Sequence, residues 1–343
     1  MLELDGRTWI PVRRSNLRYY EDVELYYLNP AGRVVLYKPA GMAFSDKALD
    51  GKPYLGDLYL RPEDKIRALR EAQRGFSTGL TAKIAAGSLE TMREIKDELT
   101  TMVDETLSEP RSGGLKLMPE FVASVVGGYS SRPNVIKYLA RISHTDYSTA
   151  IHSINAMALT LGYCFYTARS EQESAEFGLA ALLHDIGKVD VDPQILIAPR
   201  KLTDDEFEQM KRHPASGAQI LAEYGDTMRT AAEAALHHHL KLDGSGYPDD
   251  TPGPMSEIGR IISIVDTYEA LTNDDRPYRN AMRPIEALKL IKEDVDTGRY
   301  DREIFRNFAY SLTDFSSHKP RLSSGSIAGP EIGRIIGGDP SGR

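Results

Sequence analysis

The hydrophobic positions near the start of the chain follow the short alternating pattern that is typical of β-strands. Runs rich in β-branched and aromatic residues occupy residues 8–13, 23–29, 33–38 and 58–60. The segment Asn29-Pro30-Ala31-Gly32 separates the second run from the third, and these residue types favour a tight turn. We therefore expect a hairpin here, within a small β-rich domain that covers residues 1–75.

The pattern then changes to the three- and four-residue spacing of helices. One apolar stripe consists of Leu89, Met92, Ile95, Leu99, Met102, Val103 and Leu107. This stripe either packs within its own domain or forms the seam of a homodimer through a helix at residues 81–107. Residues 76–143 are accordingly predicted to be a helical linker.

From residue 144 to residue 312, one predicted helix follows another, with breaks at Gly162, Gly187 and Pro214. Beyond them the chain becomes rich in Ser, Gly and Pro, and residues 313–343 are predicted to form a loose tail. The predicted fold class is α+β, with an all-α bundle preceded by the β-rich domain and the helical linker.

Composition narrows the classes of function. The 343 residues are enough for two domains, and the net charge of −8 provides no basic footprint for DNA or RNA. Cys164 is the only cysteine, so no intramolecular disulfide can form. The N-terminus lacks the pattern of a signal peptide, and no apolar run reaches about 18 residues. We expect a cytoplasmic protein with no membrane partner.

Seven of the eight histidines lie between residues 144 and 239. His184 and Asp185 are predicted to occupy the last turn of an apolar helix that Gly187 caps in the left-handed conformation. A buried carboxylate in such surroundings costs several kcal/mol unless it is paired or bound to a metal. Taken alone, a His-Asp pair is more often a structural hydrogen bond than a metal site.

Two further histidine motifs stand at predicted helix ends. His213 is predicted to end a helix because Pro214 follows, and in isolation it would be an ordinary C-terminal histidine favoured by the helix dipole. In His237-His238-His239, adjacent side chains point about 100° apart on a helix, so at most two of them reach one ion. The alternative is a solvated histidine cluster.

His152 and Asp266 complete the set of unusual polar residues. His152 lies just off the apolar face of a predicted helix, where a histidine is more often packed than bound to metal. Asp266 interrupts an apolar helix and needs a partner, unless it forms a polar edge with Ser263 and Glu269. Together these nitrogen and oxygen donors suit iron, manganese, zinc or nickel, and the lack of cysteine ligands argues against a structural zinc.

The order of these motifs resembles that of the HD-GYP family. The matching segments are His152-Ser153, His184-Asp185-Ile186-Gly187-Lys188, His213-Pro214, His238-His239, Asp243-Gly244-Ser245-Gly246-Tyr247-Pro248, Asp266, Ala270-Leu271-Thr272 and Arg276-Pro277-Tyr278-Arg279. The resemblance covers residues 144–312 and implies an all-helical HD-type catalytic domain. It also implies a metal-dependent phosphodiesterase that cleaves cyclic di-GMP to linear pGpG and sometimes onward to GMP.

The resemblance also implies roles for individual residues. One metal ion would be held by His152, His184, Asp185 and Asp266, and the other by His213, His238 and His239, with Asp185 bridging the two. We expect two divalent ions, with iron favoured over manganese, zinc and nickel.

Other positions are assigned to catalysis and to the substrate. Asp185 and Lys188 are the predicted catalytic residues. Lys188, Arg276 and Arg279 are the cations placed on substrate phosphates, although each could instead form a surface ion pair. Tyr247 is placed against a guanine, whereas its loop could also line the pocket or bind other signalling proteins.

The chain departs from the family pattern at several positions. Leu240 replaces the usual Glu after the paired histidines, His237 is an additional histidine, and Glu269 replaces a more usual Asp. One extra residue lies within Asn273-Asp274-Asp275, and Ser148 stands where some members have a third-metal Glu. These departures leave two alternatives open, a weakly active or inactive cyclic di-GMP sensor or scaffold, and a hydrolase of another cyclic dinucleotide. The full set of seven ligands favours an enzyme.

Overall fold

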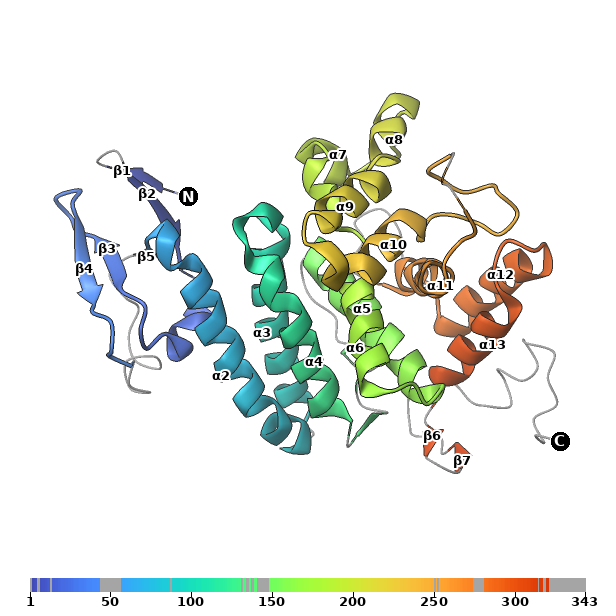
Figure 1. The fold of residues 1–343 in the computed structure, drawn as a ribbon, viewed down its shortest axis with the longest axis horizontal. Helices are drawn as coiled ribbons and strands as arrows, with labels where there is room; N and C mark the ends of the chain where they lie inside the picture. The colour runs from blue at the N-terminus through green and yellow to red at the C-terminus, as the bar shows by residue number, and fades with distance from the viewer. Residues whose placement is uncertain are drawn as a thin grey trace. The chain divides into compact units, whose positions relative to one another are not determined.

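The chain folds into two compact units (Figure 1). Unit 1 comprises Met1–Thr106 and Ser112–Leu117, and unit 2 comprises Leu107–Arg111 and Met118–Arg343. The computed structural model describes residues 2–4, 7–12, 14–43, 57–86, 88–130, 132–133, 136, 139–140, 148–249, 251, 253–273, 281–313, 315–316 and 319–320. Each unit is described by itself.

Unit 1 contains an antiparallel sheet. Its strands are β1 (Leu2–Leu4), β2 (Arg7–Pro11), β3 (Leu25–Leu28), β4 (Val34–Lys38) and β5 (Leu58–Leu60), in the order β1-β2-β5-β3-β4. The predicted hairpin is confirmed, because β3 pairs with β4. The Asn29 side chain accepts hydrogen bonds from the backbone N–H groups of Ala31 and Arg33, and Gly32 supplies the positive φ of the turn. Strand β1 was not predicted.

The other regular elements among the described residues of unit 1 are helices. They are η1 (Arg14–Tyr19), η2 (Pro62–Asp64), α2 (Lys65–Ala86), α3 (Leu89–Leu107) and η4 (Gly114–Leu117). The predicted apolar stripe lies on α3, where Ile95, Leu99, Met102 and Val103 are buried. Burial in the folded chain agrees with the first of the two interpretations of this stripe, as part of a core.

The described part of unit 2 contains helices and one short strand pair. Its elements are η3 (Pro110–Ser112), α4 (Met118–Tyr129), α5 (Thr149–Tyr166), α6 (Glu171–Leu183), η6 (Ile186–Asp190), α7 (Pro193–Leu196), α8 (Asp204–Met210), α9 (His213–Ala222), η7 (Gly225–Met228), α10 (Arg229–His237), α11 (Glu257–Thr272), α12 (Pro284–Asp296), α13 (Arg302–Ser311), β6 (Phe315–Ser316) and β7 (Lys319–Pro320). The predicted α+β class with an all-α C-terminal bundle is confirmed. No helix among the described residues has both the length and the apolar composition needed to cross a membrane.

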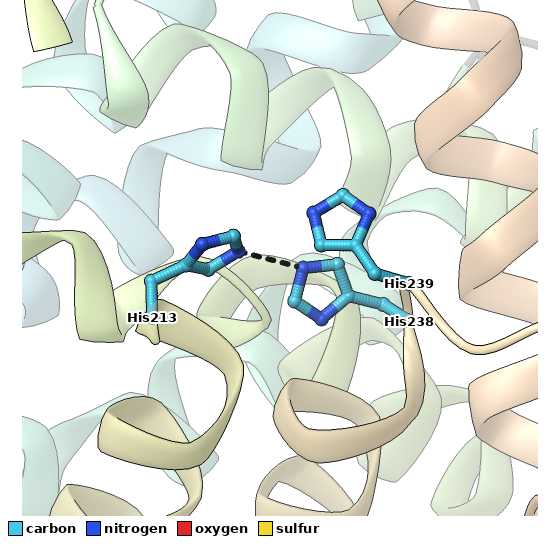
Figure 2. A group of neighbouring side chains, drawn as sticks. All are labelled: His213, His238 and His239. Carbon is cyan, nitrogen blue, oxygen red and sulfur yellow. Dashed lines mark hydrogen bonds between the residues drawn. The ribbon is translucent and has the colours of Figure 1, made fainter. Parts of the chain in front are cut away.

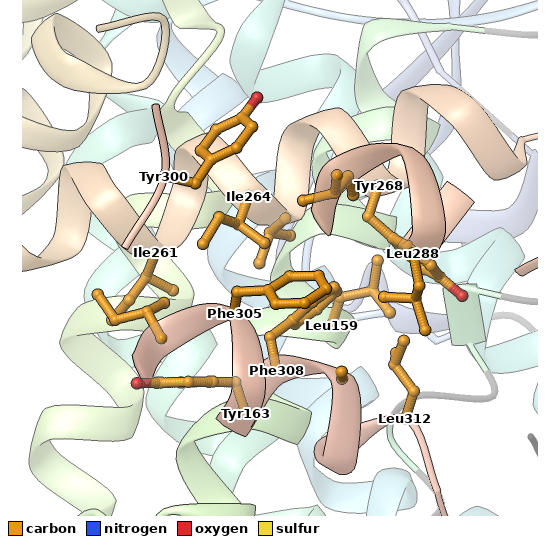
Figure 3. Close-up of a cluster of buried hydrophobic side chains, with 14 of the residues drawn as sticks. Leu159, Tyr163, Ile261, Ile264, Tyr268, Leu288, Tyr300, Phe305, Phe308 and Leu312 are labelled. Atoms are coloured by element: carbon orange, nitrogen blue, oxygen red, sulfur yellow. The ribbon is translucent and has the colours of Figure 1, made fainter. Parts of the chain in front are cut away.

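A large apolar core fixes the helices α5 and α11. Phe305 and Phe308 of α13 belong to one buried cluster with Leu159 of α5 and Ile264 of α11 (Figure 3). Leu288 of α12 is fully buried in the same cluster. Burying side chains of this size stabilises the unit by roughly 1.5–3 kcal/mol each. The two helices that carry His152 and Asp266 are therefore held rigidly side by side.

The predicted left-handed cap at Gly187 is wrong. Helix α6 ends at Leu183, and Gly187 lies inside η6 without a positive φ. Glycine is needed there for a different reason, because a Cβ atom at this position would lie 2.0 Å from the carbonyl oxygen of His213 and 2.4 Å from the backbone nitrogen of Gly217. The close approach of η6 to α9 thus accounts for this glycine.

The predicted position of His213 at the end of a helix is also wrong. Helix α8 ends at Met210, and His213 is the first residue of α9. Pro214 stands in the first turn of α9, where its missing N–H would have no helical partner in any case. The proline therefore starts the second helix after the chain has turned out of the first.

Replacing Gly187 with alanine should destabilise the protein by about 1–3 kcal/mol or more, because the added methyl group meets backbone atoms that cannot move aside independently. Urea unfolding followed by circular dichroism would measure the change. The matched control is Gly127→Ala in α4, where a Cβ would meet no atom within 4 Å and stability should rise by up to about 1 kcal/mol. Equal stability of Gly187→Ala and the wild type would contradict the packing argument.

Candidate metal centre

Seven side chains from five helices and their ends converge on one region of unit 2. His152 lies within α5, His184 caps the end of α6, and Asp185 follows it. His213 begins α9, while His238 and His239 follow the end of α10. The ligand atoms of His213, His238 and His239 lie within 4.8 Å of one another, as do those of His152, His184 and Asp266. All seven predicted metal ligands are brought together.

Asp185 lies between the two groups of ligands. Its Oδ2 atom is 3.3 Å from Nε2 of His152 and 3.6 Å from Nε2 of His184. Its Oδ1 atom is 3.3 Å from Nε2 of His213 and 3.7 Å from Nε2 of His238. One buried carboxylate thus presents one oxygen to each group, which is the geometry that a bridging ligand requires.

Asp266 belongs to the first group and faces the second. Its Oδ1 atom is 3.2 Å from Nε2 of His152 and 3.9 Å from Nε2 of His184. Its Oδ2 atom is 4.0 Å from Nδ1 of His239. Helix α11 thus supplies a second carboxylate within 4.0 Å of imidazole nitrogens of both groups.

The outer nitrogens of the imidazole rings are occupied by hydrogen-bond acceptors. Nδ1 of His184 is 2.7 Å from the carbonyl oxygen of Ala181, and Nδ1 of His213 is 2.7 Å from that of Met210. A carbonyl oxygen only accepts hydrogen bonds, so each Nδ1 carries the proton. The Nε2 atom of each of these rings then carries no proton, and its lone pair is directed into the centre.

These bare nitrogens face one another at short range. The Nε2 atoms of His152 and His184 are 3.1 Å apart. Those of His213 and His238 are also 3.1 Å apart, and Figure 2 shows these two rings facing each other. Nδ1 of His238 is bound to a backbone carbonyl as well, at 2.8 Å from that of Ala235. Two lone pairs at this distance repel each other unless a cation lies between them. The donor set therefore fits a pair of metal ions.

Burial keeps three of the imidazole rings, those of His184, His238 and His239, in the neutral form. It lowers the pKa of His184 below the ordinary histidine value and lowers that of His238 further. It lowers the pKa of His239 to about 3. Neutral imidazole is the form that binds metal ions, so the environment holds the rings ready for coordination.

The carboxylates are kept ionised in spite of burial. Burial alone would raise the pKa of Asp185, but the ammonium group of Lys188 and the neighbouring imidazoles together outweigh burial and hold that pKa well below the usual range. Lys188 Nζ is 2.5 Å from Asp185 Oδ2. Burial would also raise the pKa of Asp266, but the contributions of His152, His239 and His184 together outweigh burial and hold that pKa well below its usual range. Two negative charges thus accompany the neutral rings.

The loop of residues 243–248 folds against the centre. The ring of Tyr247 lies 4.5 Å from that of His239, centroid to centroid, at an interplanar angle of 30°. Gly246 allows this approach, because a Cβ there would lie 2.2 Å from the carbonyl oxygen of His239. Tyr247 also contacts Phe207 of α8 edge to face at 6.1 Å. The predicted substrate-binding tyrosine therefore borders the metal ligands.

The remaining predicted residues are placed differently. His237 turns away from the centre, and its Nδ1 accepts a hydrogen bond from the backbone N–H of Ser256 at the start of α11. The doubt over which two of the three histidines converge is thereby resolved in favour of His238 and His239. Arg276 and Arg279 lie outside the described residues.

Sequence reasoning missed the contact of Glu269. Its Oε2 atom is 2.6 Å from Nδ1 of His152. The available signal was its position three residues after Asp266, which places both carboxylates on one face of α11. The sequence places Glu269 on a polar edge with Asp266 and marks it as a departure from the usual Asp, but neither observation predicts its contact with His152.

A comparison with protein families agrees with this geometry. The model of the HD domain matches residues 131–304, about half of the chain, and this range contains all seven ligands. The chain belongs to the HD-domain family. The HD-type domain expected from the motifs is thereby confirmed.

Curated relatives resemble the HD domain over part of their length. The cyclic di-GMP phosphodiesterase PA4108 of Pseudomonas aeruginosa is 36% identical over 197 residues, which cover 57% of this chain and 46% of that protein. The 3'3'-cGAMP-specific phosphodiesterase 1 of Vibrio cholerae is 37% identical over 129 residues, covering 37% of this chain and 29% of that protein. The chain therefore spans less than half the length of these relatives.

A solved structure shares the fold. It is that of Bd1817, an HDG"Y"P protein from Bdellovibrio bacteriovorus, with a TM-score of 0.59 and 17% sequence identity. The match covers 88% of this chain and 98% of that one. At this level of identity the likeness concerns the arrangement of the chain alone.

Acidification should destabilise the metal-free protein. The pKa of His239 is about 3 in the folded chain and about 6.5 in an unfolded one, so the unfolded state takes up protons first as the pH falls. Stability is therefore full above about pH 6.5 and declines toward pH 3, with a loss from His239 of about 2 kcal/mol at pH 5. Asp185 and Asp266 add to the loss only below about pH 4.

Urea unfolding in the presence of a chelator at pH 8 and pH 5 would measure this effect. The variant His239→Asn lacks the titrating ring, and its loss of stability over this range should be smaller by about 2 kcal/mol. If the variant lost as much stability as the wild type, the depressed pKa would not be the cause.

Proposed function

We propose that this protein hydrolyses a phosphodiester bond of cyclic di-GMP with the help of two divalent metal ions, of which iron is favoured and manganese, zinc or nickel are alternatives. The observation that carries the proposal is the set of bare imidazole nitrogens gathered on both sides of Asp185. Residues 144–312 are the proposed catalytic domain, and residues 1–75 the proposed regulatory domain.

The proposed reaction needs what this arrangement of residues offers. A phosphodiester is an anion that repels a hydroxide nucleophile. A pair of divalent ions, when bound, supplies an activated water and neutralises charge on the phosphate. Asp185 would help to hold both ions, because it presents one oxygen to each group of imidazoles. Lys188 would place a further positive charge beside them.

The substrate would be held by groups around the centre. Lys188 is one fifth exposed, so its ammonium group has access to a phosphate as well as to Asp185. Arg276 and Arg279 are proposed to bind the second phosphate through their forked donors. Tyr247 is proposed to stack on a guanine, since its ring already packs against that of His239.

A hydrolase of cyclic GMP-AMP is the second candidate. It is favoured by the similarity to the Vibrio cholerae proteins named 3'3'-cGAMP-specific phosphodiesterases. Both substrates contain a guanine and two phosphodiesters, so the metal centre serves either of them. Comparing kcat/KM for the two cyclic dinucleotides would distinguish the candidates.

Replacing Asp185 with asparagine should remove metal and turnover together. Asparagine keeps the shape but lacks the charge and the second acceptor oxygen. We expect kcat/KM for cyclic di-GMP to fall by roughly 100-fold or more, beyond the 10–100-fold that is typical of outer-sphere partners. Elemental analysis and chromatography of the products, under reducing and metal-replete conditions, would measure both effects.

The control for this variant is Asp226→Asn, an exposed carboxylate paired with Arg229, which should retain metal and activity. Retained turnover in Asp185→Asn would contradict the bridging role. If the metal-replete wild type releases no linear product, the protein is not a cyclic di-GMP hydrolase, and a binding or scaffold role becomes the better account.

Replacing Lys188 with methionine should raise KM for cyclic di-GMP by roughly 10–100-fold, because a hydrogen bond to a charged group is worth about 1.5–3 kcal/mol. Methionine keeps the unbranched stem without the charge. Initial rates over a range of substrate concentrations would measure KM, with Lys292→Met in α12 as the control, since Lys292 pairs with Asp296 instead. An unchanged KM would refute the phosphate contact.

A further inference from the structure

Glu269 is a buried carboxylate that faces the metal centre from behind one ligand. It is 2% exposed, and its Oε2 atom lies 2.6 Å from Nδ1 of His152. The other nitrogen of that ring, Nε2, lies 3.1 Å from His184 Nε2 and 3.2 Å from Asp266 Oδ1. The two nitrogens of His152 therefore have separate tasks, because one meets Glu269 and the other faces the centre.

The second oxygen of Glu269 is held by two amide groups. Asn155 Nδ2 donates to Oε1 at 2.8 Å, and Asn273 Nδ2 donates to the same atom at 2.6 Å. Asn155 lies on α5, in the turn after His152, and Asn273 caps the end of α11. These donors offset the cost of burying the charge and leave Oε2 to accept from the ring of His152.

The hydrogen bond from Nδ1 of His152 to Glu269 differs in kind from the Nδ1 hydrogen bonds of three other histidines of the centre. His184, His213 and His238 donate from Nδ1 to neutral backbone carbonyls. Among these four rings, His152 alone has a carboxylate at that place. A carboxylate acceptor strengthens the hydrogen bond and makes the opposite nitrogen a stronger donor to a cation.

We propose that Glu269 is a positioning residue that sets the affinity of one of the two ion positions, the one formed by His152, His184 and Asp266. It holds His152 in the tautomer with the proton on Nδ1 and fixes the plane of the ring. The position formed by His213, His238 and His239 does not depend on this contact. The inference rests on the metal centre of the proposed function.

The substitution Glu269→Gln tests the role of the carboxylate with little change in shape. A glutamine amide must direct its NH2 group either at the Nδ1 proton of His152 or at the two asparagine donors, so a donor meets a donor in both orientations. Titration of Mn²⁺ into the protein of residues 1–343, after a chelator has removed bound metal, would give the affinity of each position when followed by isothermal calorimetry. The wild type should bind two ions tightly. In the variant, one position should weaken by roughly 10–100-fold while the other is retained.

A double variant identifies the affected position. His213→Ala removes a ligand of the other group, so this single variant should keep the position of His152. Combined with Glu269→Gln, it should bind no ion tightly. Two equally weakened positions in Glu269→Gln would indicate general loosening of the fold and would overturn the proposal, as would two ions bound with wild-type affinity.

Two further variants complete the test. Glu257→Gln changes a carboxylate on the same helix that pairs with Arg169 at 2.6 Å, and both Mn²⁺ affinities should stay as in the wild type. Glu269→Asp keeps the charge and should recover part of the lost affinity. If Glu269→Gln does not fold, Asn273→Ala is the alternative variant, because it removes one hydrogen-bond donor to the carboxylate. It should weaken ion binding at the same position by several-fold. Unchanged affinity at that position would overturn the proposal.

These measurements need no substrate. A wild type that binds no Mn²⁺ would refute the metal centre itself. A wild type that binds two ions and does not cleave cyclic di-GMP would refute the proposed reaction and leave the role of Glu269 standing.

Discussion

The hydrogen bonds that imidazole rings donate from Nδ1, the nitrogen remote from the metal centre, are the interaction on which the rest of this site depends. The rings concerned are those of His152, His184, His213 and His238. Each donates from Nδ1 to an oxygen that only accepts, so each directs a bare Nε2 toward the oxygens of Asp185. Without a cation, this arrangement brings lone pairs and negative charge together in a buried space. The cost of that arrangement is the physical reason to regard the region as a metal centre.

The fold keeps the rings in these orientations by close packing. The core formed by α5, α11, α12 and α13 prevents the two helices that carry His152 and Asp266 from moving apart. On the other side, η6 approaches α9 so closely that no side chain fits at Gly187. A similar approach occurs at Gly259, where a Cβ would lie 2.4 Å from that of His237. Glycines thus allow the ligand-bearing segments to come within reach of one another.

Charge in this region is arranged for an anionic ligand even though the chain as a whole is acidic. Neutral rings and two ionised carboxylates would bind two divalent ions with net positive charge remaining. Lys188 adds a cation beside Asp185, and Tyr247 provides an aromatic surface next to His239. The phosphates and the guanine of a cyclic dinucleotide match these two features, and Glu269 would tune the centre from behind without contacting the substrate.

The sequence by itself determined the parts of this protein that depend on local chemistry. The hairpin follows from Asn29 and Gly32, which are suited to the turn wherever the strands lie. The identity of the donors also follows, because buried histidines and aspartates in apolar helices require partners. Tertiary structure decided the rest. Three features depend on which segment of the chain packs against the residue concerned. They are the role of Gly187, the helix that His213 begins, and the convergence of His238 rather than His237 on the centre. The direction of each ring nitrogen depends on an oxygen supplied by the surrounding fold, and for His152 that oxygen comes from a separate helix, so local sequence could not reveal it.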